Sequence, residues 1–385
     1  MEILHFAPSE MTGESTVFTL STSSDLKILV TEWFEGYVSE SSDKSSDSEV
    51  SEDHPARFNS PRAPITEKAI FYVKRSVLAE NNVWLAKEQD DTINLRTDEP
   101  YGIKGLCVWL AAFHGQSTPF STMSIDDIWG AIKVGNINDF DRRKLQPWFE
   151  GWVARIRDEQ PVKWNDVLFN RQLLFPCHFF DDAEGFKHLT RCLVYNTHWS
   201  SPIKESKPIE FNRRGLNPEF VTHQLNAVRD RLRTTLQGQI SAEVDRCLKQ
   251  SPCDCNETAI CAYLKEVNRI GIAPWGDTFS QSSIKEITDK LELFDQAHIR
   301  KPNVKPCDCE CSPPCGCSIA WDEAVKKFRK DTLEYFDGLC LDCMKHSPRK
   351  NSKYWNRPSH QDGYDKDCRI EHGKVSWYFS FMGYR

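Results

Sequence analysis

The sequence predicts an α+β protein in which a small sheet flanked by helices precedes a mainly helical region and a cysteine-rich tail. Three observations support this class. Three strand-like apolar runs lie within residues 25–96, helical periodicity continues after them, and five of the 15 cysteines gather within residues 307–317. Strands followed by helices are typical of α+β architecture. A chain of 385 residues is also long enough for two or three domains.

Three short segments near the N-terminus have the composition of strands. They are DLKILVT at residues 25–31, KAIFYV at 68–73 and TINLR at 92–96, which are rich in β-branched and aromatic residues. Residues 76–87 separate the second strand from the third, and their pattern predicts a helix. The expected order is therefore strand, loop, strand, helix, strand.

Between the third strand and the cysteine-rich region, only helices are expected. Residues 101–114 place apolar side chains at helical spacing, and two further helices are predicted at 125–134 and 142–156. The apolar positions of the first of these helices are Ile103, Leu106, Leu110 and Phe113.

Residues 39–64 form an acidic, serine-rich insert between the first two strands. Almost no apolar residue occurs in it before Phe58, so burial cannot offset the entropy of ordering it, and we expect a disordered loop. Several serines, such as Ser45 and Ser48, precede acidic residues, a pattern that suits an acid-directed kinase. A solvated linker without modification is the simpler interpretation.

Short sequence motifs on the C-terminal side of the insert resemble those of the fungal branch of the BTB/POZ domain family. FYVKRSVLA at residues 71–79 is similar to that family's strand-to-helix turn, and GLCVWLAAF at 105–113 to its following helix. Lys74 departs from the pattern, because the family usually has histidine there, and the acidic insert replaces a short turn. The resemblance implies a BTB-like domain at 20–156 after an N-terminal arm at 1–19. It also implies self-association or partner binding, in some relatives as an adaptor for a cullin-type ubiquitin ligase.

Residues 157–300 are expected to form a helical domain without chemistry of its own. Asn217 and Pro218 predict a helix start, and Ser283 with Glu286 predicts a capping box. A further helix should begin near residue 180 and run to Leu193. The stripe that follows Pro218 consists of Val221, Leu225, Val228, Leu232 and Leu236, a pattern typical of a core-facing surface.

The cysteine-rich region at 301–385 carries the strongest chemical signal. Cys340 and Cys343 form a CxxC turn after a helix expected at 319–337 and ended by Gly338. Cys368 and His372 supply two more soft ligands, so these four residues match one tetrahedral zinc ion. His346 competes for the fourth position. Thiols that bind no metal are the alternative interpretation.

A second, tentative metal site is built from Cys253 and Cys255 with two of the five cysteines in residues 307–317, taken as Cys307 and Cys311. One zinc ion cannot use all five thiols, and spacing does not decide which two bind. A redox-active or exposed cluster is the alternative. The remaining cysteines are interpreted as packed core thiols, and they are Cys107, Cys177, Cys192, Cys247 and Cys261.

The tail, with Tyr335 to Met344 and Trp377 to Gly383, resembles the cysteine-bearing C-terminal region that accompanies the BTB-like domain in filamentous-fungal proteins. In its last residues, Trp377, Phe379 and Phe381 alternate with polar positions. That alternation predicts a final strand buried on one face.

Composition narrows the function classes. The net charge of −7 argues against a nucleic-acid or anionic-membrane partner, and the sequence has no P-loop, GxGxxG, G-x-S-x-G or HExxH motif. Without a signal peptide or an apolar stretch long enough to span a membrane, we expect a cytoplasmic or nuclear protein. The predicted function is non-enzymatic protein interaction without a small-molecule substrate. The alternative is a zinc-dependent nucleic-acid-binding or transcription-associated module.

Overall fold

The computed structural model confirms a mixed α+β chain and describes most of it. The residues described are 11–12, 15–34, 65–81, 83–87, 89–97, 102–116, 123–203, 218–250, 255–273, 276, 279, 281–299, 320–346 and 368–371. The acidic insert at 39–64, residues 307–317 and the expected final strand lie outside these ranges. The chain divides into two compact units, Met1–Arg155 and Ile156–Arg385.

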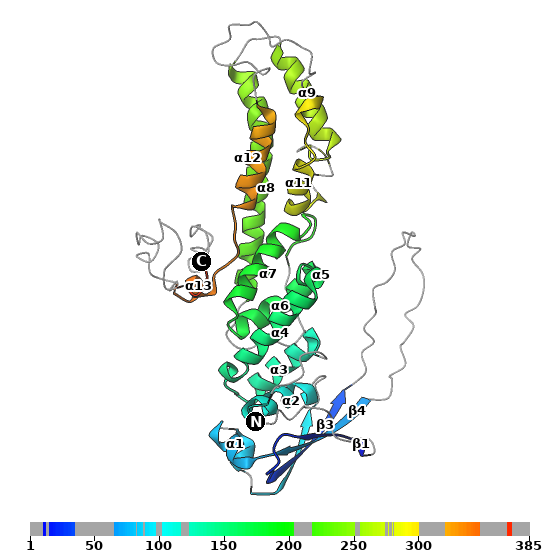
Figure 1. Cartoon of the computed structure of the whole chain (residues 1–385), viewed down its shortest axis with the longest axis vertical. Coiled ribbons are helices and arrows are strands. Elements are labelled where there is room, and N and C mark those ends of the chain that lie inside the picture. The colour runs from blue at the N-terminus through cyan, green and yellow to red at the C-terminus, as the bar shows by residue number, and fades with distance from the viewer. Residues whose placement is uncertain are drawn as a thin grey trace, which may run out of the picture. The chain divides into compact units, whose positions relative to one another are not determined.

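The first unit is built on a five-stranded sheet with the order β1-β2-β4-β3-β5 (Figure 1). Its strands are β1 (Met11–Thr12), β2 (Ser15–Thr19), β3 (Leu26–Phe34), β4 (Ile65–Val73) and β5 (Thr92–Thr97). The three predicted strands are confirmed as β3, β4 and β5. The sheet also includes β2, which pairs in parallel with β4, so residues expected in the N-terminal arm belong to the sheet. That strand carries Val17 and Phe18, and Phe18 stacks on Phe71 at 4.9 Å.

Strands β3 and β4 form an antiparallel pair that continues to Phe34 and Ile65. The acidic insert therefore joins two residues that are paired in the sheet. Closing a long loop costs only slightly more entropy than closing a short one, so the hairpin tolerates the insert. Strand β5 returns parallel to β3, which requires a crossover connection.

The predicted helix at 76–87 is wrong in its extent, because the structure splits it. Helix α1 (Arg75–Glu80) ends at Asn81, and a 3-10 helix, η1, covers Trp84–Lys87. The Asn81 side chain donates to the carbonyl oxygen of Val77 at 2.8 Å. This bond satisfies a carbonyl at the helix end, where asparagine is favoured over helix interiors.

Helices α2 (Gly102–Phe113) and α3 (Ile125–Ile137) follow, then η3 (Arg142–Lys144) and α4 (Gln146–Glu159), whose last residues lie beyond the unit boundary. Gly105 lets α2 and α3 approach closely, since a Cβ there would lie 2.7 Å from the backbone of Gly130. The fully buried Trp109 donates its indole N–H to the carbonyl oxygen of Ala131 at 2.7 Å. Helix α2 is thus the centre of this core, as its apolar pattern predicted.

The second unit is helical over the residues that the structure describes (Figure 1). Its elements are α5 (Pro161–Trp164), α6 (Val167–Phe179), α7 (Ala183–Asn196), α8 (Pro218–Gln250), α9 (Cys255–Arg269), α11 (Ile284–Leu291), η4 (Gln296–His298), α12 (Trp321–Leu333) and α13 (Leu341–His346). The capping box of Ser283 and Glu286 is present, and α8 begins at Pro218 as predicted. The expected cap, Asn217, lies outside the described residues.

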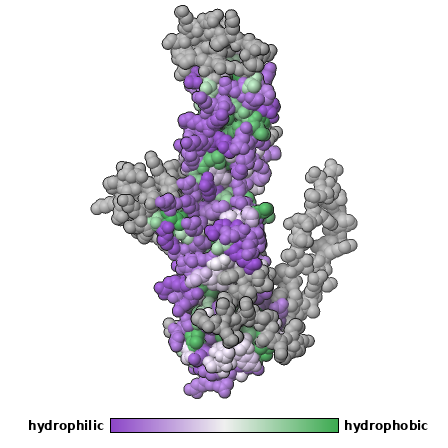
Figure 2. Space-filling view, in the orientation of Figure 1, coloured by the Kyte–Doolittle hydropathy of each residue, from purple (hydrophilic) through white to green (hydrophobic). Residues whose placement is uncertain are grey.

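Helices α8, α9, α11 and α12 share one hydrophobic core. The predicted stripe on α8 is buried from Val221 to Leu236. Tyr263 of α9 stacks on Trp321 of α12 at 4.3 Å and donates to the carbonyl oxygen of Ile240 at 2.8 Å. Hydrophilic residues dominate the described surface seen in Figure 2, with small apolar patches between them. No helix in the described ranges is both long and apolar enough to cross a bilayer.

Candidate metal centre

The segment that carries the CxxC turn leaves α12 earlier than the sequence predicts. Helix α12 ends at Leu333 rather than near residue 337. Helix α7 donates to two carbonyl groups at this end: Tyr195 donates to the carbonyl oxygen of Thr332 at 2.7 Å, and Arg191 donates to that of Leu333 at 3.2 Å. Carbonyl groups in the last turn have no partner in a regular helix, so these contacts suit the earlier end.

Gly338 therefore has a different role from the helix stop that its position suggested. Its φ is +106°, and a Cβ there would press on the carbonyl oxygen of Lys187 in α7. Only glycine combines this backbone conformation with such a close approach. The next residue, Leu339, donates its N–H to the buried Thr190 hydroxyl at 2.8 Å. The chain is thus fixed on α7 directly before the first cysteine of the turn.

Three of the four residues predicted for the first zinc site come together. Cys340 precedes α13, Cys343 lies in its first turn, and Cys368 arrives from a segment 25 residues further on. Their sulfur atoms all lie within 4.8 Å of one another, and those of Cys343 and Cys368 are 3.6 Å apart. Sulfur ligands of a tetrahedral zinc ion are separated by about 3.8 Å, given Zn–S bonds of about 2.3 Å. The three thiols therefore have the spacing of zinc ligands.

Two of the three thiols are almost fully buried: Cys340 is 0% exposed and Cys343 is 1% exposed. The pKa of Cys343 is raised far above its ordinary value, first by its hydrogen bond with Cys340 and then by burial. Burial is also the main cause that raises the pKa of Cys368, to about 12. Clustered thiols resist ionisation because each thiolate would repel the next. A bound cation would remove that repulsion and release protons.

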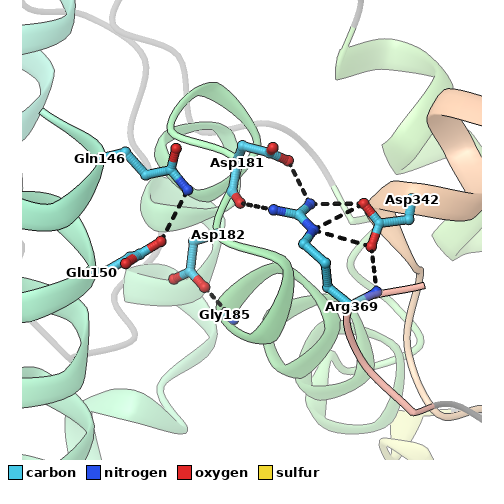
Figure 3. A network of polar contacts seen from close by, with 7 residues as sticks. All are labelled: Gln146, Glu150, Asp181, Asp182, Gly185, Asp342 and Arg369. Atoms are coloured by element: carbon cyan, nitrogen blue, oxygen red, sulfur yellow. Dashed lines mark hydrogen bonds and ion pairs between the residues drawn. The ribbon is translucent and has the colours of Figure 1, made fainter. Parts of the chain in front are cut away.

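Arg369 holds Cys368 at the cluster. Its guanidinium bonds both carboxylate oxygens of Asp342 at 2.8–3.2 Å and a carboxylate oxygen of Asp181 at 2.8 Å, while its backbone N–H donates to Asp342 at 2.9 Å. Figure 3 shows Arg369 lying between the two carboxylates. Bidentate pairs of this kind are geometrically specific. The residue before Cys343 and the residue after Cys368 are thereby linked.

Asp181 and Asp182 directly precede α7 and have different partners. The side chain of Asp182 accepts from the N–H of Gly185 and caps α7 (Figure 3). Asp181 has a φ of +62° and directs its carboxylate to Arg369. Nothing in the spacing of the sequence indicates this long-range pair.

Most of the second predicted site lies outside the described residues. Cys253, Cys307 and Cys311 are not described, nor is His372 of the first site. Cys255 begins α9, but its side chain and that of His346 are not described. Cys261 was expected to be a core thiol and is exposed, because it lies on the side of α9 opposite the buried Tyr263. Cys107, Cys177, Cys192 and Cys247 are buried as predicted.

One polar cluster was missed at the sequence level. The sulfur of Cys192 lies 3.2 Å from Nε2 of His188, one turn earlier on α7. The signal was present, because His188-x3-Cys192 repeats in reverse order the Cys-x3-His spacing of Cys368 and His372. A lone His-x3-Cys pair inside an amphipathic helix does not by itself indicate a cluster, because its third member, Asn165, lies in another segment.

Comparisons with protein-family models, with characterised proteins and with solved structures find no match to this chain. The resemblance to the BTB/POZ family therefore remains a prediction from short sequence motifs. What the structure shows is the geometry of the centre: two buried thiols and one partly buried thiol that could together hold one metal ion.

Proposed function

We propose that this chain is a non-catalytic protein-interaction protein. In this proposal the α+β unit binds a protein partner or a second copy of the chain, as the BTB-like resemblance implies. A structural zinc ion at Cys340, Cys343 and Cys368, with His372 as the fourth ligand, fixes the C-terminal segment on α7. Action as an adaptor for a cullin-type ubiquitin ligase is the most specific form of this function.

The observation that carries the interaction proposal is the order and pairing of elements in the first unit. A hairpin of β3 and β4 is followed by α1, by β5 parallel to β3, and then by helices. This is the order that the resemblance implies, and the acidic insert adds length only at the end of the hairpin. A domain of this kind acts through its surface and needs no catalytic residues.

The metal ion has a structural role in this proposal. Cysteine-rich zinc sites are usually closed, whereas catalytic zinc sites keep a position for water. Two of the three thiols are almost fully buried, which leaves little room for a substrate. A bound zinc ion would cross-link α13 to the segment that begins at Cys368. Gly338 and Arg369 position these two segments next to each other.

The interaction proposal can be tested with an exposed apolar residue in each unit. Ile137 on α3 is 68% exposed and Leu293 in the helical unit is 63% exposed. We expect light scattering to detect self-association of the full-length protein, or affinity purification to recover a defined partner. Ile137→Asp should weaken that association, and Leu293→Asp should not. A strictly monomeric protein that recovers no partner would contradict the proposal.

The metal proposal is tested separately. Full-length protein purified with zinc available and without chelator should contain stoichiometric zinc, and Cys343→Ser should lower that content by one ion per chain. Cys107→Ser is the matched control, because Cys107 is a buried thiol of the other unit. Equal zinc content in wild type and Cys343→Ser would exclude the centre.

A further inference from the structure

A second cluster of metal-ligating atoms lies on α7 and at the end of α5, and it is independent of the cysteines discussed above. It consists of His188, Cys192 and Asn165. Cys192 Sγ lies 3.2 Å from His188 Nε2 and 3.6 Å from Asn165 Oδ1. A nitrogen and an oxygen atom from two helical segments thus both lie close to the Cys192 sulfur.

The orientation of each partner is fixed by a further contact. Besides Cys192, the ring of His188 makes a hydrogen bond to the backbone of Trp164 that raises its pKa, so the ring donates to the carbonyl oxygen. Because Nε2 faces Cys192, Nδ1 is the nitrogen left to donate. The Asn165 amide nitrogen donates to the carbonyl oxygen of Pro161 at 2.9 Å, which turns its oxygen towards the thiol.

Among these three side chains there are more acceptors than protons to share. With Nδ1 protonated, Nε2 of His188 is an acceptor, and Asn165 Oδ1 is an acceptor by nature. The single S–H proton of Cys192 can satisfy only one of them. A cation, in contrast, can be shared by all three atoms. A histidine that donates its second ring nitrogen to a backbone carbonyl is also the usual condition of a metal-bound imidazole.

The two distances from the Cys192 sulfur are close to those in a tetrahedral zinc site. With bonds of about 2.3 Å to sulfur and about 2.0–2.2 Å to nitrogen or oxygen, ligand atoms lie about 3.6 Å from the sulfur. The Asn165 oxygen already has this separation from Cys192. His188 needs to move by only about 0.4 Å, within the range of a small ring rotation.

The surroundings of the cluster allow a zinc ion to enter but reduce its affinity for the site. Asn165 is exposed, His188 is half-buried, and Cys192 is 9% exposed, so the cluster opens to the surface beside Asn165. Burial lowers the pKa of His188, which keeps the imidazole neutral, as a ligand must be. The positive charges of Arg157 and Arg191 act on the same ring. They oppose a divalent cation, so this site should be weaker than the three-thiol centre.

We propose that His188 Nε2, Cys192 Sγ and Asn165 Oδ1 bind a second zinc ion, with water in the fourth position. On binding, the Cys192 thiol releases one proton to solvent and its thiolate forms the bond to zinc. The Trp164 indole, stacked on His188 with ring centres 4.8 Å apart, covers one face of the ring. An open coordination position would distinguish this site from the closed structural centre.

Residue-specific alkylation provides the test, because other cysteines of the chain can also bind zinc. Full-length protein is stripped of metal, titrated with Zn²⁺, and treated with iodoacetamide, and the alkylation of each cysteine is followed by peptide mass spectrometry. We expect Zn²⁺ to slow alkylation of Cys192 at least about tenfold in wild type. His188→Gln should abolish this protection although Cys192 is still present, and Asn165→Ala should shift it to higher zinc concentration.

Controls separate this site from the first centre and from misfolding. Cys177, a buried thiol beside Asp182, should show no zinc-dependent change. Cys343→Ser should leave the protection of Cys192 intact. Circular dichroism must show the same helix content for His188→Gln and wild type without metal, and if it does not, Asn165→Ala becomes the deciding variant. If Zn²⁺ leaves the alkylation rate of Cys192 in the wild-type protein unchanged, the second site does not exist.

Discussion

Arg369 donates to both carboxylate oxygens of Asp342, which links the residue after Cys368 to the residue before Cys343. The cluster is therefore held by an ion pair as well as by any metal. The Arg369 side chain is 42% exposed and that of Asp342 is 8% exposed, so the pair is anchored on its acidic side. Because Arg369 is not itself a ligand, replacing it tests how the centre is positioned without removing any ligand.

Replacing Arg369 with methionine should weaken zinc binding without removing a ligand. We expect a loss of affinity of about 10–100-fold, the effect typical of contacts that orient metal ligands. Competition with a chromophoric zinc chelator measures it. Lys327→Met is the control, because Lys327 forms an ion pair with Asp331 on the exposed face of α12. Equal affinities for wild type and Arg369→Met would show that the ion pair does not position Cys368.

Gly338→Ala should destabilise the C-terminal segment. The substitution combines a positive φ with a collision between the new Cβ and the carbonyl oxygen of Lys187, and we expect a cost of about 2–4 kcal/mol. Urea unfolding measures the total. Gly115→Ala separates the two causes, since Gly115 has a φ of +65° but open space around its Cα. It should cost only about 1 kcal/mol, and a similar small loss at Gly338 would contradict the proposed close contact.

Glu266 should make the helical unit sensitive to acid. Hydrogen bonds from Arg269 are the main cause that lowers the pKa of this carboxyl, whose side chain is 1% exposed. A lowered folded-state pKa contributes stability above the unfolded-state value of about 4.3, and this stability is lost as the pH falls through the folded-state value. Glu266→Gln should therefore cost about 1–3 kcal/mol near neutral pH and much less in acid. Urea unfolding of wild type and Glu266→Gln from acid to neutral pH measures this cost. If the difference in unfolding free energy between the two proteins did not change with pH, the charge of Glu266 would not be its cause.

Tyr195→Phe should weaken the contact between α7 and the end of α12. The phenol is the donor to the buried carbonyl group of Thr332 at 2.7 Å, and its removal leaves that carbonyl without this bond. We expect a loss of about 1–2 kcal/mol in thermal or urea unfolding. Tyr263→Phe is the comparison, because its hydroxyl makes a similar bond, to Ile240, within the α8–α9 core. If α12 ends at Leu333 because of Tyr195, hydrogen exchange near residues 330–336 should increase only in Tyr195→Phe.

The sequence by itself determined the features that depend on neighbours along the chain. β-Branched and aromatic composition located β3, β4 and β5, and helical spacing located the buried stripe on α8. Local start signals located the beginnings of α8 and α11. The pairing of Cys340 with Cys343 followed from the spacing of a single turn. Each of these features rests on contacts a few residues apart.

Only the tertiary structure decided which distant groups meet. The parallel pairing of β2 with β4, the end of α12 at Leu333 and the bond between Asp181 and Arg369 each join segments far apart in sequence. The same holds for the approach of Asn165 to Cys192 from another helix. Such contacts depend on how helices and strands pack, and spacing along the chain does not encode their distances. For that reason the sequence found the CxxC turn, and the fold showed that Arg369 brings Cys368 to it.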